Sequence, residues 1–351
     1  MLLTALPPST LPDGLATQLA SLGILTSTDL VFSNTSSLGI YTRLSSKSIS
    51  FPDFEACIEA ISEKLAAPGQ SAAELDLEIR SDFKMDTLSA LDEQLGGGLT
   101  CTRVIEISGD RGSGKSILLL NWALELLLKN KEIEILWIDT TGDFSVQRAV
   151  QILEHHQQTV DDMEAMLQRL HISTAVDIES VQKIFRALDL QLALQASIPR
   201  MKCVVIDSVT PLLGPFLSAV SSQGHAIMSA FMRYLRELAT RHSLLVLLVN
   251  NATLMRAPST GRSQTSAEPV SNPYSDFAST IRKPALGPSF TFMTDATLWV
   301  SIYPEQIENE DRSTAHVVEV FRSKFSVSRV WSTFKITSSG ALLAGPIVGS
   351  I

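Results

Sequence analysis

The residues best suited to chemistry form the octapeptide Gly109-Asp110-Arg111-Gly112-Ser113-Gly114-Lys115-Ser116. It matches the G-x-x-x-x-G-K-[ST] pattern of a phosphate-binding loop at every fixed position. In such a loop, backbone N–H groups and the N-terminus of the next helix surround a phosphate. Lys115 is predicted to reach the terminal phosphates of a nucleotide, and Ser116 to bind a magnesium ion. A glycine-rich surface turn is the alternative interpretation.

The segments on either side of the octapeptide favour phosphate binding. Residues 103–107 form a short apolar run that is typical of a buried strand, and residues 117–129 form a leucine-rich segment without a helix breaker. Strand, glycine loop and helix therefore follow one another in the order that a phosphate site needs. We predict that the octapeptide binds a nucleotide.

Two further strand ends carry candidate polar groups. Asp207 ends an apolar run, and an acid in this place holds the magnesium shell in phosphate-loop ATPases. After another such run the chain has Thr141, where a glutamate would stand to activate water. A threonine hydroxyl is a poor general base because its pKa lies far above neutrality. Asp139 and Asp143 could substitute for the missing glutamate, although the sequence does not fix where they point.

The apolar spacing divides the chain into two parts. Residues 1–66 predict a small helical N-terminal domain, residues 67–82 a linker, and residues 83–351 an α/β core. Strands that alternate with helices in this core predict a mainly parallel central sheet with helices on both faces. The expected strands are Val104–Ile107, Ile133–Ile138, His171–Ser173, Cys203–Ile206, Leu244–Val249, Asp295–Ile302 and Val317–Phe321, and the expected helices are 116–129, 145–156, 178–196 and 224–242.

Two segments of the core stand out from this alternation. The last two expected strands follow each other closely, which predicts an antiparallel hairpin at the edge of the sheet. Residues 255–283 are rich in Ser, Thr, Pro, Asn and Arg and predict a long flexible loop, which is either functional or disordered. The loop carries a mild excess of basic residues, namely Arg256, Arg262, Arg282 and Lys283 against Glu268 and Asp276. It could follow a phosphate backbone, or it could be a solvated insertion.

The composition narrows the class of protein. The 351 residues are 45% hydrophobic and 19% charged, which is typical of a globular chain, and no apolar run is long enough for a membrane span. The N-terminus lacks the features of a signal peptide, and three distant cysteines favour a reduced, intracellular protein. A net charge of −9 argues against strong nonspecific binding of nucleic acid, so DNA contact would need a local patch or an assembly.

Together these motifs resemble the RecA-type strand-exchange ATPases, in particular the recombinase paralogues of eukaryotes and their D-type branch. The resemblance covers roughly residues 85–335 and includes the glycines at 96–98, the octapeptide and the strand ends at 138–140 and 205–208. Its most discriminating piece is Lys283-Pro284-Ala285-Leu286-Gly287-Pro288-Ser289-Phe290, which looks like the segment after the second DNA-binding loop of those paralogues.

The resemblance implies a role for each matching position. Residues Gly109 to Ser116 would bind ATP phosphates, Ser116 and Asp207 would hold Mg²⁺, and Arg148 would lie against the adenine. Residues 214–224 and 252–283 would be the two DNA-facing loops. Ala252 stands where active recombinases have a polar side chain that senses the γ-phosphate. With Thr141, this change predicts weak hydrolysis and leaves binding intact.

The resemblance also implies a cellular role. We expect an ATP-binding nuclear protein that acts in homologous recombination and DNA double-strand-break repair. It would assist recombinase filament assembly in a complex with other paralogues, and it would meet single-stranded or branched DNA through that assembly. The alternative is a self-sufficient DNA-dependent ATPase with strand-exchange activity. A phosphate-loop kinase for a small molecule is a third interpretation, but no lid or acceptor pocket can be identified in the sequence.

Overall fold

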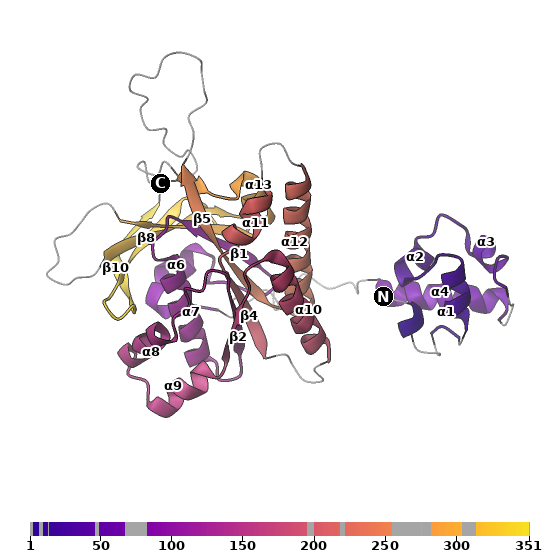
Figure 1. The fold of residues 1–351 in the computed structure, drawn as a ribbon, viewed down its shortest axis with the longest axis horizontal. Helices are drawn as coiled ribbons and strands as arrows, with labels where there is room; N and C mark the ends of the chain where they lie inside the picture. The colour runs from indigo at the N-terminus through magenta and orange to yellow at the C-terminus, as the bar shows by residue number, and fades with distance from the viewer. Residues whose placement is uncertain are drawn as a thin grey trace, which may run out of the picture. The chain divides into compact units, whose positions relative to one another are not determined.

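The computed structural model describes residues 3–6, 10–12, 14–45, 49–66, 83–194, 200–217, 222–254, 275, 282–303 and 314–350. The chain divides into two compact units, Met1–Glu78 and Ile79–Ile351 (Figure 1). The predicted linker 67–82 lies outside the described residues, as does almost all of the predicted loop 255–283. Within the described ranges, no helix has the combination of length and apolar character that a membrane crossing requires.

The N-terminal unit consists of short helices around a small apolar core. The helices are η1 (Leu3–Ala5), α1 (Leu15–Ser21), α2 (Ser27–Val31), α3 (Ser37–Tyr41) and α4 (Phe51–Leu65). Thr26 begins α2 with a capping box, because its hydroxyl accepts the N–H of Asp29 while the Asp29 carboxylate accepts the N–H of Thr26. Leu15, Leu19 and Phe54 are fully buried in the core of this unit.

The second unit is built on one ten-stranded sheet. Its strands are β1 (Val104–Gly109), β2 (Glu134–Asp139), β3 (Leu170–Thr174), β4 (Met201–Asp207), β5 (Leu245–Leu254), β6 (Arg282–Pro284), β7 (Ala296–Ile302), β8 (Thr314–Ser323), β9 (Val330–Ile336) and β10 (Leu342–Ser350). They lie in the order β10-β9-β8-β7-β1-β5-β4-β2-β3, with β6 paired to β5. The pairs from β7 to β3 are parallel, and β7 to β10 pair antiparallel.

Helices cover both faces of this sheet, as the sequence predicts (Figure 1). Successive side chains of a strand point to opposite faces, so Cys203 and Val205 of β4 join one apolar core while Val204 and Ile206 join the other. The first core packs against α6 (Ser89–Gln94), α7 (Lys115–Lys129), α8 (Val146–His155) and α9 (Val160–Leu167), and a short η2 (Asp86–Leu88) precedes α6. The second packs against α10 (Ile178–Leu194), α11 (Thr210–Leu213), α12 (Ser222–Arg241) and α13 (Gly287–Met293), and η3 (Gly214–Phe216) follows α11.

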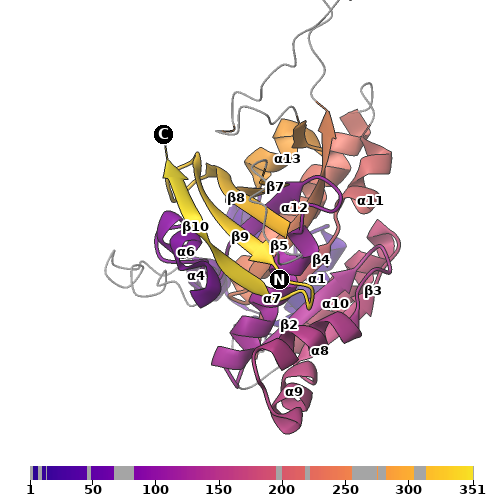
Figure 2. The same ribbon diagram turned by 90° about the vertical axis from the view of Figure 1, so that its left-hand side faces the viewer.

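The antiparallel part of the sheet is larger than predicted. The expected hairpin exists as β7 and β8, but it does not lie at the edge, because β9 and β10 continue the sheet beyond β8 (Figure 2). The helices α9 and α13 and the short strand β6 were not predicted from the sequence either. Since β6 starts at Arg282, the last two residues of the predicted loop 255–283 belong to a strand instead.

A buried carboxylate fixes β1, the strand that leads into the phosphate loop. Glu106 accepts hydrogen bonds from Asn250 of β5 (2.6 Å), Ser108 of β1 (2.8 Å) and Thr297 of β7 (2.8 Å). Burial raises the pKa of Glu106 above its ordinary value, and these three donors oppose that rise. The network joins β1 to both neighbouring strands directly below the loop.

The back of the phosphate loop rests on His316 of β8. Its Nδ1 lies 2.9 Å from the carbonyl oxygen of Ser113, and its ring stacks on Phe334 with a centroid distance of 5.3 Å. The imidazole is buried, and this burial lowers the pKa of His316 below its ordinary 6.5, against the opposing effect of the Ser113 carbonyl. His316 is therefore neutral at pH 7 and becomes costly to bury in acid.

We predict that Phe54→Ala loosens the N-terminal unit and leaves the second unit intact. Removing a fully buried phenyl ring costs about 3–5 kcal/mol, and the unit has its own core. Hydrogen exchange in the full chain should speed up in residues 14–66 and stay unchanged in β1. Phe32→Ala, at a side chain 76% exposed in the same unit, is the matched control. Faster exchange in β1 as well would contradict this prediction.

We also predict an acid-dependent loss of stability that runs through His316. Because the folded-state pKa is lowered, the unfolded chain binds more protons below pH 6.5, so stability is present above that pH and is lost as the pH falls. The free energy of unfolding, measured with urea, should fall between pH 7.0 and pH 5.5 in the wild type. In His316→Gln this fall should be smaller by about 1 kcal/mol. His225→Gln, at an exposed histidine, should follow the wild type. Equal losses in all three proteins would refute the assignment.

Candidate functional site

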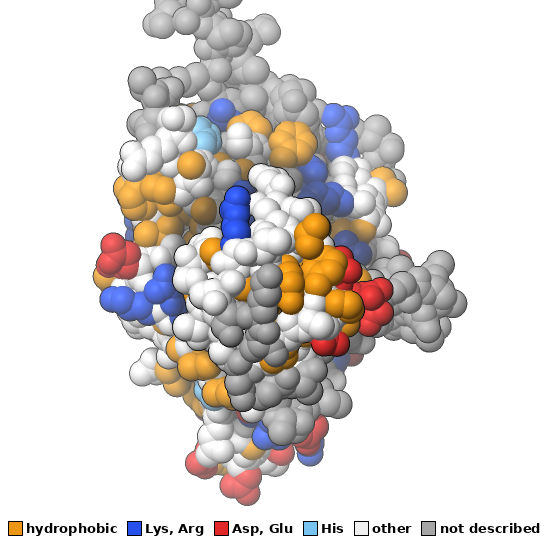
Figure 3. All heavy atoms as spheres, turned by 90° about the vertical axis from the view of Figure 1, so that its right-hand side faces the viewer, with side chains coloured by type: hydrophobic (Ala, Val, Ile, Leu, Met, Phe, Trp, Pro, Cys, Tyr) orange, Lys and Arg blue, Asp and Glu red, His pale blue; other side chains and the backbone are white. Residues whose placement is uncertain are grey.

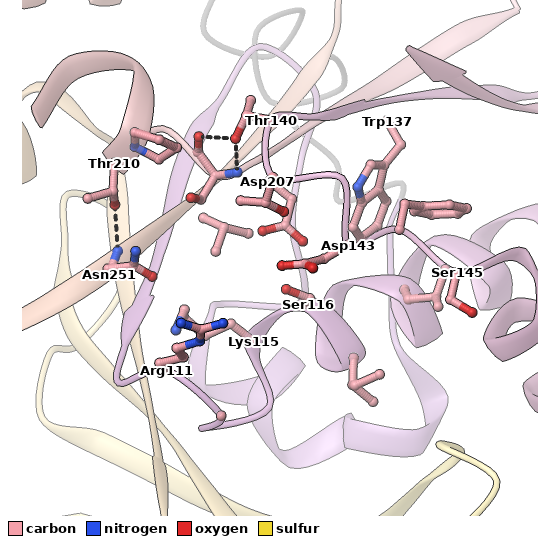
Figure 4. Close-up of a pocket in the computed structure, with 18 of the residues that line it drawn as sticks. Arg111, Lys115, Ser116, Trp137, Thr140, Asp143, Ser145, Asp207, Thr210 and Asn251 are labelled. Carbon is pink, nitrogen blue, oxygen red and sulfur yellow. Dashed lines mark hydrogen bonds between the residues drawn. The ribbon is translucent and has the colours of Figure 1, made fainter. Parts of the chain in front are cut away.

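A cavity of about 870 Å³ opens at the carboxyl ends of β1, β2, β4 and β5 (Figure 4). Six of the predicted site residues line it, namely Arg111, Gly112, Lys115, Ser116, Arg148 and Asp207. The other four, Gly109, Asp110, Ser113 and Gly114, form the turn that carries the lining residues and do not line the cavity themselves. The structure therefore brings the octapeptide, the β4 acid and Arg148 to one place.

Glycines allow the octapeptide to make this turn. Gly109 ends β1 so close to the carbonyl oxygen of Val300 that a Cβ at this position would collide with it. Gly114 has a φ of 97°, in the left-handed region, and immediately precedes Lys115, the first residue of α7. The loop thus passes directly from the buried strand into the helix, and the helix N-terminus faces the cavity.

The Lys115 ammonium has no anionic hydrogen-bond partner in this loop. Its Nζ donates to the carbonyl oxygens of Gly109 (2.9 Å) and Asp110 (2.6 Å). Burial lowers the pKa of Lys115 to about 8, although the charges of Asp207 and Asp110 oppose this fall. An anion in the cavity would restore the pKa of Lys115, and by linkage the charged lysine favours anion binding.

Ser116 and Asp207 lie together as a magnesium site would require. The Ser116 side chain lies near the Asp207 carboxylate at the end of β4 (Figure 4). Burial raises the pKa of Asp207, and the negative charges of Asp139 and Asp143 add to that rise, whereas Ser116 and Lys115 oppose it. A divalent cation beside this carboxylate would remove the unfavourable interaction. The donor set of hydroxyl and carboxylate oxygens fits Mg²⁺.

The Asp139 carboxylate is hydrogen-bonded to the turn that follows β2. Its carboxylate accepts the N–H groups of Thr141 (3.0 Å), Gly142 (2.9 Å) and Phe144 (3.0 Å). Burial alone would raise the pKa of Asp139, but these hydrogen bonds hold it below its ordinary value. The Thr141 hydroxyl also donates to Asp139, at 3.2 Å. Asp139 therefore stabilises the loop, which leaves Asp143 as the acid of this turn that lines the cavity.

The far wall of the cavity combines aromatic and aliphatic surface with Arg148. Trp137 and Phe144 both line it, with ring centroids 5.4 Å apart. Arg148 lies in the first turn of α8, and its side chain packs on Gly340, where a Cβ would come within 2.7 Å of its Cδ. A flat apolar wall beside a guanidinium is suited to a nucleotide base.

The strand end of β5 contributes Asn251 to the cavity, and Ala252 is not a lining residue. The N–H of Asn251 donates to the hydroxyl of Thr210 (2.8 Å), and that hydroxyl donates to the Asn250 side chain (2.8 Å). Asn251 thus offers an amide side chain near the position where the resemblance places a γ-phosphate sensor. Ala252 pairs with Pro284 of β6.

An ion pair joins β6 to the phosphate loop. Arg282 Nε lies 3.1 Å from Asp110 Oδ1, and both side chains are partly exposed. The sequence places Arg282 in a basic loop that could follow a phosphate backbone or be a solvated insertion; in the structure its guanidinium faces a carboxylate of the phosphate loop. Asp110 and Arg282 are 172 positions apart in the chain, so no local pattern in the sequence could predict this contact.

Several lining residues escaped the sequence analysis. They are the polar residues Thr140, Ser145, Ser208, Thr210 and Asn251 and the apolar residues Ile117, Leu120, Trp137, Phe144, Pro211 and Val249. Four of the polar ones follow strand ends and Asn251 lies near the end of β5, which is a usable signal because parallel strands end at one edge of the sheet. Thr140 illustrates this: its hydroxyl donates to the Ser208 carbonyl and accepts the Ser208 N–H, both at 2.7 Å, and so joins the ends of β2 and β4.

Comparison with known proteins gives relatives in DNA repair. The chain is 31% identical over 183 residues to "DNA repair protein RAD51 homolog 4" of Bos taurus, which covers 50% of this chain and 56% of that protein. It is 24% identical over 221 residues to "DNA repair protein RAD51 homolog 2" of Mus musculus, covering 58% and 62%. The chain thus spans little more than half the length of the relatives it matches.

The solved structures agree on the fold. The crystal structure of the RadB recombinase matches with a TM-score of 0.54 at 20% identity, covering 75% of this chain and 99% of that one. The Rad51 family model matches residues 83–283, which is more than half of this chain. This range includes the octapeptide, Arg148 and Asp207. The chain belongs to the Rad51 family and has the RecA-like fold of its recombinases and their paralogues.

Proposed function

We propose that this chain binds ATP with Mg²⁺ and acts as a recombinase paralogue in the nucleus, in homologous recombination and double-strand-break repair. The observation that carries the proposal is the contrast within one cavity. Lys115, Ser116 and Asp207 bring an ammonium, a hydroxyl and a carboxylate to the cavity, which supports binding of phosphate and a cation, whereas Thr141 replaces the expected base and its hydroxyl donates to Asp139. Binding without rapid hydrolysis is the behaviour that this contrast supports.

A bound nucleotide that persists is suited to holding an assembly together. A ligand that binds only the folded state stabilises that state in proportion to its occupancy. In this proposal the chain assists recombinase filament assembly within a complex of paralogues, and single-stranded or branched DNA is reached through that complex. The names of its relatives, which are DNA repair proteins, support this assignment.

The N-terminal unit offers a surface for a neighbouring subunit in such a complex. Leu25, Phe32 and Leu38 are exposed to 54%, 76% and 55%, and Figure 3 shows hydrophobic side chains on the outer surface of this unit. Exposed apolar side chains favour contact with another protein where they form a contiguous patch. We assign the unit to subunit docking.

The alternative is a self-sufficient DNA-dependent ATPase with strand-exchange activity. The acid Asp143 in the cavity is the observation that favours it. The two functions differ in turnover, because the alternative requires rapid DNA-stimulated hydrolysis by the purified chain.

We predict that the purified chain binds an ATP analogue in the presence of Mg²⁺ and that Lys115→Ala weakens this binding. Losing charged hydrogen bonds to phosphate costs about 1.5–3 kcal/mol, which corresponds to about 10- to 100-fold in Kd. Fluorescence anisotropy with a labelled nucleotide measures the affinity. Lys131→Ala, at an exposed lysine after α7, should bind like the wild type. A folded wild type that binds no nucleotide, alone or with recombinase paralogues, would refute the proposal.

We further predict that Thr141→Glu raises ATP turnover on single-stranded DNA. A positioned general base contributes about 10²- to 10⁴-fold, so a gain of roughly 10-fold or more is expected even where the geometry is imperfect. In Thr141→Gln the new side chain has the length of glutamate but no carboxylate, so turnover should stay at the wild-type rate. Phosphate release with and without DNA measures turnover. Rapid wild-type turnover that Thr141→Glu does not increase would instead establish the self-sufficient ATPase.

A further inference from the structure

Asp143 is a cavity acid whose role the family pattern does not explain. It lines the cavity, and Figure 4 shows its carboxylate pointing toward Ser116 on the side of Asp207. Its negative charge contributes to the raised pKa of Asp207, so the two carboxylates interact across the site. Among the residues that the structure describes, Asp143 has no hydrogen-bond or ion-pair partner.

The turn after β2 holds Asp143 in this position. Gly142 has a φ of 78°, and the N–H groups of Thr141, Gly142 and Phe144 all point to the Asp139 carboxylate. Phe144 then packs on Trp137. With the residues on both sides fixed, the Asp143 side chain projects into the cavity from a short, closed turn.

The other acids near the phosphate loop already have partners. Asp139 accepts N–H groups of its own turn, Asp110 pairs with Arg282, and Asp207 lies near the charge of Lys115. Hydrolysis of a nucleoside triphosphate needs a group that orients the attacking water and takes its proton. Asp143 has the chemistry for both tasks, because an ionised carboxylate only accepts hydrogen bonds.

We propose that Asp143 positions the attacking water in place of the glutamate that Thr141 replaces. This inference rests on the proposed nucleotide binding. The water oxygen forms the bond to the γ-phosphorus, the bond from that phosphorus to the β–γ bridging oxygen breaks, and the nucleoside diphosphate leaves with the electron pair. The water proton passes to the Asp143 carboxylate and then to the released inorganic phosphate. Aspartate is one methylene shorter than glutamate and stands two residues later, so the resulting turnover is slow.

The test is the turnover of Asp143→Asn, which keeps the shape and removes the charge. Single-turnover hydrolysis by the full chain with ATP, Mg²⁺ and single-stranded DNA should fall at least about 10-fold. The Kd for nucleotide should stay the same or become tighter, because a negative charge beside the triphosphate is lost. Asp143→Glu should retain turnover. Asp161→Asn, at an exposed acid on α9, is the matched control.

Three results on turnover and nucleotide affinity would overturn the inference. The first is a wild-type rate no higher than that of Lys115→Ala, the second is an Asp143→Asn rate equal to the wild type, and the third is a joint loss of turnover and nucleotide affinity. A Mg²⁺ titration distinguishes a water-positioning Asp143 from one that binds the metal. The Mg²⁺ concentration that gives half-maximal turnover should be the same in Asp143→Asn as in the wild type. A tenfold shift of that concentration would contradict water positioning. Wild-type protein that binds no nucleotide contradicts the proposed function itself, whereas intact binding with unchanged turnover contradicts only the role of Asp143.

Discussion

The fold buries the positive charge of Lys115, and among the residues that the structure describes no carboxylate forms an ion pair with it. Backbone carbonyls of Gly109 and Asp110 hold the ammonium, and burial lowers its pKa to about 8. The cost of desolvating that charge falls when an anion enters the cavity. The rest of the site serves this arrangement: Glu106 fixes β1 to its neighbours below the loop, and His316 supports the loop from behind.

Phosphate binding and hydrolysis place separate demands on the strand ends, and this chain meets them unequally. In the proposed function, phosphate and Mg²⁺ are held by α7, which begins with Lys115 and Ser116, and by β4, which ends at Asp207. The turn after β2 serves loop stability first, because Asp139 accepts three backbone N–H groups and the Thr141 hydroxyl. The acid of this turn that remains for catalysis is Asp143, whose side chain is shorter than that of a glutamate. In the proposed function, a site of this kind holds nucleotide more readily than it hydrolyses it.

Local patterns made the main features of the fold and site predictable. The octapeptide, its strand and its helix are contiguous, and the apolar strands that end at Asp139 and Asp207 follow from composition alone. The last two antiparallel strands, β9 and β10, were harder to predict. β10 contains Gly345, Pro346 and Gly349, which read as turn residues, and β9 begins after a Ser- and Arg-containing stretch without clear alternation.

Contacts between distant segments were not predictable. The pairs Arg282–Asp110, Asn250–Glu106 and His316–Ser113 join residues more than 140 positions apart, and single-sequence patterns carry no register between such segments. The direction of the Asp139 side chain was equally open, because only the closed turn shows that its oxygens face the backbone.

The chemical state of the bound nucleotide tests the central claim most directly. Purified chain would be incubated with ATP, Mg²⁺ and single-stranded DNA, the protein-bound fraction would be isolated rapidly at intervals of minutes, and its nucleotide would be identified by chromatography. If the site binds ATP tightly and hydrolyses it slowly, the bound nucleotide should be mainly ATP at the early times and should turn into ADP slowly. Bound nucleotide that is already mainly ADP at the first interval, or a bound fraction without nucleotide, would contradict it.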